Sequence, residues 1–230
     1  MGLLMVRTGN ELAQSKINVG EIAGMMERTM DALKGASEIP LTMFKCPSGG
    51  GKTFACSDED IEVKEIEGVI VAAHYTNVYW SQPAGEGNSA PDCVSYDGLS
   101  GCYTQDGEIM ERACRSCPYN RMGSGRGGKG KACKNKARLL MLVEGQALPV
   151  QISVPTMSVN NYSRYVMRDL IPRGLEPWQV STKVTLSVTS NAGGTKYSQM
   201  MFECSGRVDD AQMIELRNSV APLLIGQGEE

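Results

Sequence analysis

One segment of the chain, residues 93–136, is too poor in aliphatic side chains to build an ordinary hydrophobic core. It is rich in cysteine, glycine and lysine, and stretches with more apolar side chains lie on both sides of it. A segment of this composition cannot bury enough apolar surface to offset the entropy of ordering its backbone. We therefore expect an inserted module that is held by something other than apolar burial.

The cysteine spacing in this segment is typical of a metal site. Cys114 and Cys117 form a C-x2-C pair, with Cys93 before it and Cys133 after it. Two thiolates three positions apart can converge on one ion from a tight turn, and a tetrahedral zinc then needs two more ligands. Cys93 and Cys133 are the best candidates, and Cys102 competes for the fourth place. Four sulfur ligands leave no open position for water, so zinc here would be structural; unligated thiols are the alternative.

Positive charge is concentrated in the same segment, although the net charge of the chain is only −3. From Arg112 to Arg138 there are nine Lys or Arg residues and no Asp or Glu. A flexible, glycine-rich chain of cations suits phosphate oxygens but not base-specific recognition, which needs side chains fixed by rigid elements. A solvated basic loop is the alternative. The candidate phosphate contacts are Arg112, Arg115, Arg121, Arg126, Lys129, Lys131, Lys134 and Lys136.

Aromatic side chains supply the other half of a nucleic-acid-binding pattern. Tyr75, Tyr79 and Trp80 lie near the end of a long predicted strand, and Trp178 begins a later one. On the face of a sheet, such rings can stack on unpaired bases whatever the base sequence. These four residues are therefore candidate stacking positions.

Outside the cysteine-rich segment the pattern predicts mainly β-structure with a few peripheral helices. Two β-rich runs joined by residues 191–194 predict a hairpin, and Ser158 is the expected N-cap of a helix that stops at Gly174. Many strands with few helices favour a small β-barrel. The expected strands are 40–46, 52–56, 61–81, 138–143 and 149–154, and two further helices are expected at 18–35 and 208–224.

The run CPSGGGKTFAC, residues 46–56, is similar to a phosphate-binding loop but departs from it in two ways. Cys46 stands where the first glycine of that loop belongs, and the residues after Thr53 favour a strand where the loop requires a helix. We therefore predict that the turn at 48–51 closes a hairpin and binds no nucleotide. Cys46 and Cys56 either form a second small site or simply pack, and packing is favoured, as it is for Cys204.

The chain contains no run of about 18 apolar residues, so no membrane-spanning helix is expected. Its first residues lack the basic start and apolar core of a secretory signal, which favours a cytoplasmic protein. In such a chain, spaced cysteine pairs bind metal more often than they form disulfides.

The run CPYNRMGSGRGGKGKACK, together with GVIVAAHYTNVYW before it and PVQISVPTMSVNNYSRYVMRDL after it, resembles a family of phage and mobile-element proteins that bind single-stranded DNA. The resemblance covers roughly residues 40–205. It implies an OB-like barrel, residues 36–92 and 137–205 of a single domain 1–230, interrupted by a zinc-binding insertion at 93–136. It also implies Cys93, Cys114, Cys117 and Cys133 as the zinc ligands.

The resulting hypothesis is a non-enzymatic protein that binds single-stranded DNA in phage replication or recombination, inside the bacterial host cell. RNA is an alternative ligand, and a second copy of the chain and replication or recombination proteins of phage or host are candidate partners. One competing hypothesis is an interaction protein that inhibits a host defence enzyme. A weaker one is a nucleotide hydrolase that acts through residues 49–53.

Overall fold

The computed structural model describes residues 41–47, 49–57, 63–82, 90–144, 146, 148–191 and 193–208, together with Gly24, Arg28, Ile214 and Asn218. The helices predicted at 18–35 and 208–224 lie mostly outside the described residues. Of their positions, the structure describes Val208 and four others, Gly24, Arg28, Ile214 and Asn218, and these four are helical. Within the described residues, no helix is both long and apolar enough to cross a membrane.

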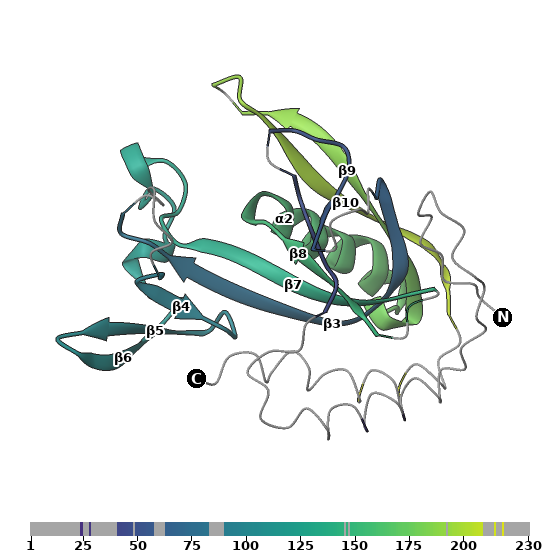
Figure 1. Cartoon of the computed structure of the whole chain (residues 1–230), viewed down its shortest axis with the longest axis horizontal. Coiled ribbons are helices and arrows are strands. Elements are labelled where there is room, and N and C mark those ends of the chain that lie inside the picture. Colours follow the sequence, from purple (N-terminus) through teal and green to yellow (C-terminus); the bar gives the residue numbers. More distant parts are fainter. Residues whose placement is uncertain are drawn as a thin grey trace. The chain divides into compact units, whose positions relative to one another are not determined.

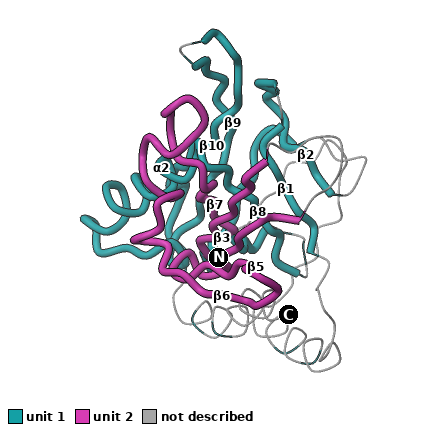
Figure 2. The backbone as a smooth tube through the Cα atoms, turned by 90° about the vertical axis from the view of Figure 1, so that its left-hand side faces the viewer, with its two compact units in different colours: residues 1–73, 139–230 teal, residues 74–138 magenta. Residues whose placement is uncertain are grey.

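The fold is mainly β, as predicted, with a peripheral helix (Figure 1). The chain divides into two compact units: unit 1 comprises residues 1–73 and 139–230, and unit 2 comprises residues 74–138 (Figure 2). The strands are β1 Met43–Lys45, β2 Ala55–Cys56, β3 Glu65–Tyr79, β4 Cys93–Ser95, β5 Ser100–Gln105, β6 Glu108–Ala113, β7 Lys134–Val143, β8 Val150–Val154, β9 Val180–Ser190 and β10 Lys196–Arg207. Strands β3 and β7 run through both units.

In unit 1 the strands follow the order β2-β1-β8-β7-β3-β9-β10. The sheet is mixed, because β1 pairs parallel with β8 whereas β1 with β2, β3 with β9, and β9 with β10 pair antiparallel. Both predicted hairpins, β1–β2 and β9–β10, are thereby confirmed. In the part of the chain that the structure describes, β2 and β10 end this order, and closure of the sheet into an OB-like barrel stays a prediction.

The core of unit 1 is centred on β7 and β3. The run Leu139–Val143 is buried throughout, as expected for a strand covered on both faces. Gly68 of β3 allows the neighbouring strand to come close, since an added Cβ atom would lie 2.1 Å from the carbonyl oxygen of Leu142. A side chain at this position would force the two central strands apart.

The helix α2, Thr156–Arg164, covers the free edge of β10 in unit 1. Ser158 is fully buried, and its Oγ accepts a hydrogen bond from the backbone N–H of Met200 at 2.9 Å. Asn161 Nδ2 donates to the carbonyl oxygen of the same residue at 3.0 Å. The two side chains thus supply the donor and acceptor that a further strand would otherwise provide.

The predicted N-cap of this helix is wrong. Pro155 occupies that position, and Ser158 lies inside the first turn, where its hydroxyl serves β10 instead of the helix end. Past α2 the chain continues as a π-helical turn, Tyr165–Leu170, and a 3-10 turn, Ile171–Arg173. The predicted stop at Gly174 is confirmed, because this residue adopts φ 68°, which glycine tolerates without strain.

Unit 2 contains the strand order β7-β3-β4-β5-β6. It is wider than the predicted insertion at 93–136, because the end of β3 and the start of β7 extend its sheet. The long connection between β6 and β7 holds two 3-10 turns, Pro118–Asn120 and Arg126–Gly128. Asp97 Oδ1 closes the turn between β4 and β5 by accepting bonds from the N–H groups of Leu99 and Ser100. The pKa of this carboxyl lies below its usual value, and the hydrogen bond from Ser100 is the largest cause.

We predict that Ser158→Ala destabilises unit 1 by about 1–3 kcal/mol, because the buried N–H of Met200 loses its acceptor. Urea unfolding, compared at constant m value, measures this change. Asn160→Ala is the matched control: this side chain is exposed on the same helix and should change stability by less than about 0.5 kcal/mol. Equal stability of the two variants would contradict the role assigned to Ser158.

Candidate functional site

The four predicted zinc ligands come together in unit 2. Cys93 on β4, Cys114 and Cys117 after β6, and Cys133 just before β7 all line one cavity of about 310 Å³. Cys114 and Cys133 are buried, and the other two are half-buried. Residues 40 positions apart in the sequence are therefore neighbours, as the zinc hypothesis requires.

Gly101 of β5 gives the sulfur atoms room. A Cβ atom at this position would lie 2.8 Å from Cys93 Sγ and 3.6 Å from Cys114 Sγ. Gly101 is buried, whereas its neighbour Cys102 is exposed, because successive residues of a strand point to opposite faces. Cys102 does not line the cavity. The geometry therefore favours Cys93 over Cys102 as the fourth member of the cluster.

The electrostatics of the cluster show what a cation would change. Burial, followed by the neighbouring thiols of Cys114 and Cys117, raises the pKa of Cys133 to about 11. The same causes raise the pKa of Cys93. Thiols in this environment stay neutral unless a metal ion compensates the charge of the thiolates.

The donor set suits zinc, but the sulfur atoms are not in a ligand shell. Among the residues that the structure describes, no three Cys, His, Asp or Glu side chains are arranged to hold a metal ion. A bound zinc would have to draw the four sulfur atoms inward from the walls of the cavity. Zinc at this cluster therefore stays a prediction.

A network of amide side chains ties the basic connection to the strands of unit 2. Asn135 on β7 donates from Nδ2 to the Oδ1 atoms of Asn77 on β3 and Asn120. Lys131 Nζ donates to Asn120 Oδ1 at 3.1 Å and to Asn135 Oδ1 at 2.9 Å. Asn120 also donates to the carbonyl oxygen of Cys114 at 3.0 Å, which links the network to the cysteine cluster. Lys131 is therefore half-buried and engaged within unit 2.

The glycine-rich connection, residues 121–131, has a defined conformation where the sequence predicted a flexible chain. The carbonyl oxygen of Gly130 accepts bonds from the N–H groups of Gly123 and Gly125 at 2.7 and 3.3 Å. Ser124 Oγ accepts the N–H of Ala132 at 3.0 Å, which closes the loop further. Four glycines of this segment, Gly123, Gly127, Gly128 and Gly130, adopt positive φ, so glycine is needed for this path. We call residues 121–131 the basic loop.

Two aromatic rings form a stacked pair beside the basic loop. The centroids of Tyr79 and Tyr119 are 4.2 Å apart and the ring planes differ by 13°. Tyr119 is 41% exposed, so part of its ring is accessible to a ligand. Two cations lie over other rings: Arg112 at 4.8 Å from the centroid of Tyr103, and Lys136 at 5.9 Å from that of Trp80.

The predicted stacking residues do not form one surface. Asn135 of β7 bonds to Asn77 and so lies on the same face of the sheet as Asn77 and Tyr79. The next residue, Lys136, points to the opposite face, because neighbouring strand residues alternate. Lys136 lies over the ring of Trp80. Trp80 therefore belongs to the other face from the Tyr79–Tyr119 pair. Trp178 lies in unit 1, where its Nε1 donates to Glu176. Tyr75 is on β3 within unit 2 and is 40% exposed.

Sequence reasoning did not select Tyr103 and Tyr119. Tyr119 stands two residues after the C-x2-C pair, and this position beside the cysteine turn is the sequence signal that could have identified it. Tyr103 lies two residues after Gly101 on the same strand face, a relation that becomes visible only once the register of β5 is known. Both residues line the cavity that holds the cysteines.

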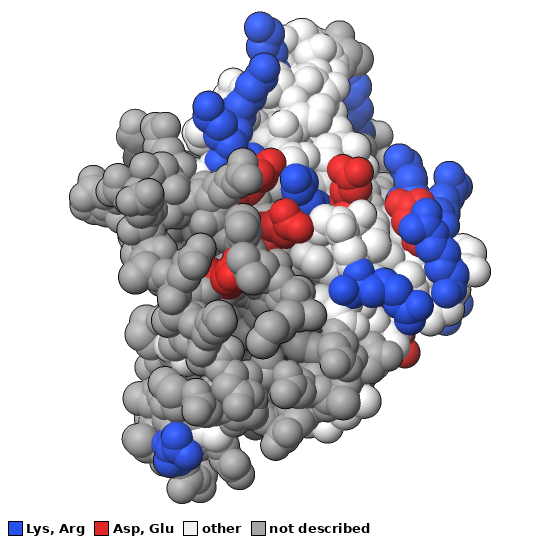
Figure 3. Space-filling model, turned by 90° about the vertical axis from the view of Figure 1, so that its right-hand side faces the viewer, with Lys and Arg blue, Asp and Glu red and all other residues white. Residues whose placement is uncertain are grey.

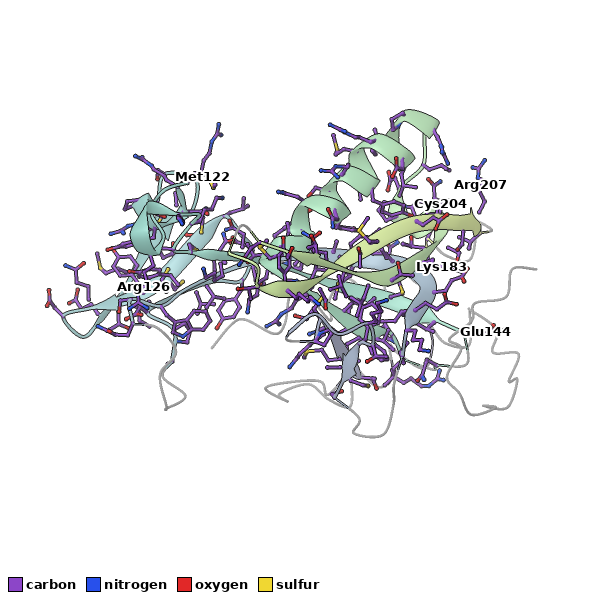
Figure 4. The ribbon with its side chains drawn as sticks, turned by 90° about the horizontal axis from the view of Figure 1, so that it is seen from above. Met122, Arg126, Glu144, Lys183, Cys204 and Arg207 are labelled. Atoms are coloured by element: carbon purple, nitrogen blue, oxygen red, sulfur yellow. The ribbon has the colours of Figure 1, made fainter. Side chains whose placement is uncertain are left out.

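The predicted cations differ in exposure. Arg112, Lys131 and Lys136 are half-buried, and each contacts a ring or amide described above. Those exposed to solvent are Arg115, Arg121, Arg126, Lys129 and Lys134. Met122 and Arg126, labelled in Figure 4, extend from the basic loop.

Positive charge elsewhere is less uniform. On the face drawn in Figure 3, acidic side chains lie among the basic ones. In unit 1, Lys183, labelled in Figure 4, forms ion pairs with Glu65 and Glu67 at 3.8 and 3.9 Å. The acid-free run from Arg112 to Arg138 therefore remains the best candidate for a surface that contacts phosphates.

The glycine turn near residue 50 has the surroundings of a hairpin. The strand β2 follows it, whereas a phosphate-binding loop would open a helix. The carbonyl oxygen of Gly51 accepts a hydrogen bond from Ser198 Oγ at 2.6 Å, which fixes the turn against β10. Cys46 is half-buried, and burial raises the pKa of its thiol to about 11, as expected for a packed cysteine.

Comparison of the chain with protein-family models, curated proteins and solved structures gives no match.

Proposed function

We propose that this protein binds single-stranded DNA through unit 2 and catalyses no reaction on it. The observation that carries the proposal is the exposed ring of Tyr119, which is held by stacking on Tyr79 beside a basic loop without acidic residues. A pre-positioned ring can stack on an unpaired base, and exposed cations next to it can neutralise the phosphates of the same strand.

A stacking ring accepts any base, and phosphate contacts carry no sequence information, so binding of this kind is sequence-tolerant. The basic loop contributes three exposed cations, Arg121, Arg126 and Lys129. The loop is held by backbone hydrogen bonds, so its backbone needs little ordering when a strand binds. These features support nucleic-acid binding without assigning any residue a catalytic role.

A structural zinc is the second part of the proposal. Cys93, Cys114, Cys117 and Cys133 would hold it, since they line one cavity and provide four sulfur donors. Zinc would fix the connection that carries Tyr119, because Cys117 and Tyr119 are two residues apart. It would also replace the apolar core that this segment lacks.

The resemblance of the CPYNRMGSGRGGKGKACK run to phage single-stranded-DNA-binding proteins supports a role in phage replication or recombination in the bacterial cytoplasm. The direct test is a gel-shift series with single- and double-stranded DNA and RNA of equal length. We expect the tightest binding to single-stranded DNA. Failure to bind any oligonucleotide in the absence of other proteins would overturn the proposal and leave inhibition of a host enzyme as the better hypothesis.

We predict about one tightly bound zinc per chain in protein purified without chelator. Cys117→Ser should lose most of this zinc and unfold unit 2, because the thiolates would no longer close a tetrahedral site. Elemental analysis and proteolysis of residues 74–138 measure the two effects. Cys204→Ser, which alters a cysteine of unit 1, is the control and should keep its zinc. Wild-type protein with less than about half an equivalent of metal would refute the site.

The salt dependence of binding should report on the basic loop. Each phosphate neutralised on a single strand contributes about −0.7 to the slope of log K against log salt concentration. The double variant Arg126→Ala, Lys129→Ala should therefore flatten the slope by about 1.4 for every sequence tested. Arg168→Ala, Arg173→Ala in unit 1 is the control, as both of these side chains are also exposed. An unchanged slope in the loop variant would remove the loop from the interface.

Loss of the exposed ring should weaken binding without altering the salt slope. We expect Tyr119→Ala to reduce affinity by about 1–3 kcal/mol, the range found for one base stacked on one ring, and Tyr119→Phe to restore it. Tyr96→Ala is the matched control, because Tyr96 is 39% exposed in the same unit but lies outside the cavity. If Tyr119→Ala and Tyr96→Ala bind equally well, Tyr119 does not stack on the ligand.

A further inference from the structure

The cavity of unit 2 is lined by more than the cysteine cluster, and the other lining residues have a different chemistry. The remaining lining includes the rings of Tyr79, Tyr103 and Tyr119 and the guanidinium of Arg112. The whole cavity, cysteine cluster included, has a volume of about 310 Å³, at the lower end of the range of about 300–1,000 Å³ for small-molecule sites.

These walls suit a flat, unsaturated group. Tyr79 and Tyr119 are stacked on one another, and Arg112 is held over Tyr103 both by its ring contact and by a hydrogen bond to the phenolic oxygen at 3.3 Å. These stacked rings and the guanidinium plane give the cavity walls made of π-systems and a delocalised cation, which favour contact with an aromatic group. Aliphatic ligands gain less from such walls than aromatic ones do.

We propose that this cavity receives a single unstacked nucleobase of the bound strand. The inference rests on the proposed function, and it adds a site at which one base is held apart from its neighbours. Removing a base from a single strand costs less than flipping it out of a duplex, because no base pair is broken. The basic loop beside Tyr119 would hold the phosphates that flank this base.

Asp92 gives the cavity a means of distinguishing bases. Its carboxylate is fixed by two hydrogen bonds from Ser81, from the backbone N–H at 2.6 Å and from Oγ at 3.1 Å. It is the one acidic residue in the described lining. An ionised carboxylate only accepts hydrogen bonds, and each of its oxygens has a lone pair left after bonding to Ser81.

The amino groups of cytosine, adenine and guanine can donate to such an acceptor, whereas thymine has no amino group. Thymine can donate only through its ring N3–H, which lies between two carbonyl oxygens that would repel the carboxylate. The structure therefore points to a preference for amino-bearing bases over thymine at one position of an otherwise sequence-tolerant strand. Cytosine and thymine give the sharpest comparison, since both are pyrimidines.

The first experiment compares oligo-dC and oligo-dT of equal length. We expect wild-type protein to bind oligo-dC about threefold to tenfold more tightly, the net effect of one ordinary hydrogen bond, because solvent weakens the bond to the exposed Asp92. In Asp92→Asn this ratio should fall toward one. Asp106→Asn is the matched control: it removes the same charge from the β5–β6 turn of unit 2, at an exposed residue outside the cavity. It should keep the wild-type ratio.

The second experiment needs no variant. An oligonucleotide with a single 5-iodocytosine is bound to wild-type protein and irradiated, and the adduct is located by mass spectrometry. An adduct on Tyr79, Tyr103 or Tyr119 supports the base site. Equal affinity for oligo-dC and oligo-dT, or adducts confined to other residues such as Trp80, would overturn the inference while leaving single-strand binding intact. Failure of both oligonucleotides to bind would instead overturn the proposed function.

Discussion

The hydrogen bonds of Asn135 are the interaction on which unit 2 most depends. This one amide joins β3, β7 and the connection after the C-x2-C turn, and it does so in a segment with few aliphatic side chains. Each buried amide in the network has partners, and no buried side-chain N or O atom of the described residues lacks one. A fully satisfied polar network is rigid, whereas a partly satisfied one would be costly in so small a unit. The position of Tyr119 and of the basic loop follows from this network.

The network and the cysteine cluster are neighbouring parts of one arrangement. Asn120 bonds to the backbone of Cys114, so the amides hold the turn from which two of the four sulfur atoms project. Without metal, the raised pKa values of Cys93 and Cys133 keep these thiols neutral, so the cluster carries no uncompensated charge. Zinc would convert the same residues into a charged, tighter site. Two sources of order would then act on a segment that apolar burial alone cannot stabilise.

Much of this could be predicted from the sequence, and the reasons are local. Alternating and continuous apolar runs identified β3, β7, β8 and the β9–β10 hairpin, and cysteine spacing identified the four residues that share a cavity. The sequence misplaced the cap of α2, because Ser158 has the chemistry of an N-cap but is recruited by a strand 42 residues away. It also grouped Trp80 with Tyr79, since proximity in sequence does not reveal the face on which a ring lies. Lys131 was predicted to contact phosphate, and only the tertiary structure shows its bonds to two asparagines.

The covered edge of β10 also bears on how copies of this chain can meet. An uncovered strand edge is a template on which another chain can continue the sheet, and this is a common route to aggregation and to exchange of strands between molecules. In unit 1, Ser158 and Asn161 already use the donor and acceptor of Met200, in the middle of β10. A second molecule could not extend the sheet there without first displacing α2. Assemblies of this protein, including any that form along a strand of DNA, would therefore have to use surfaces other than this edge.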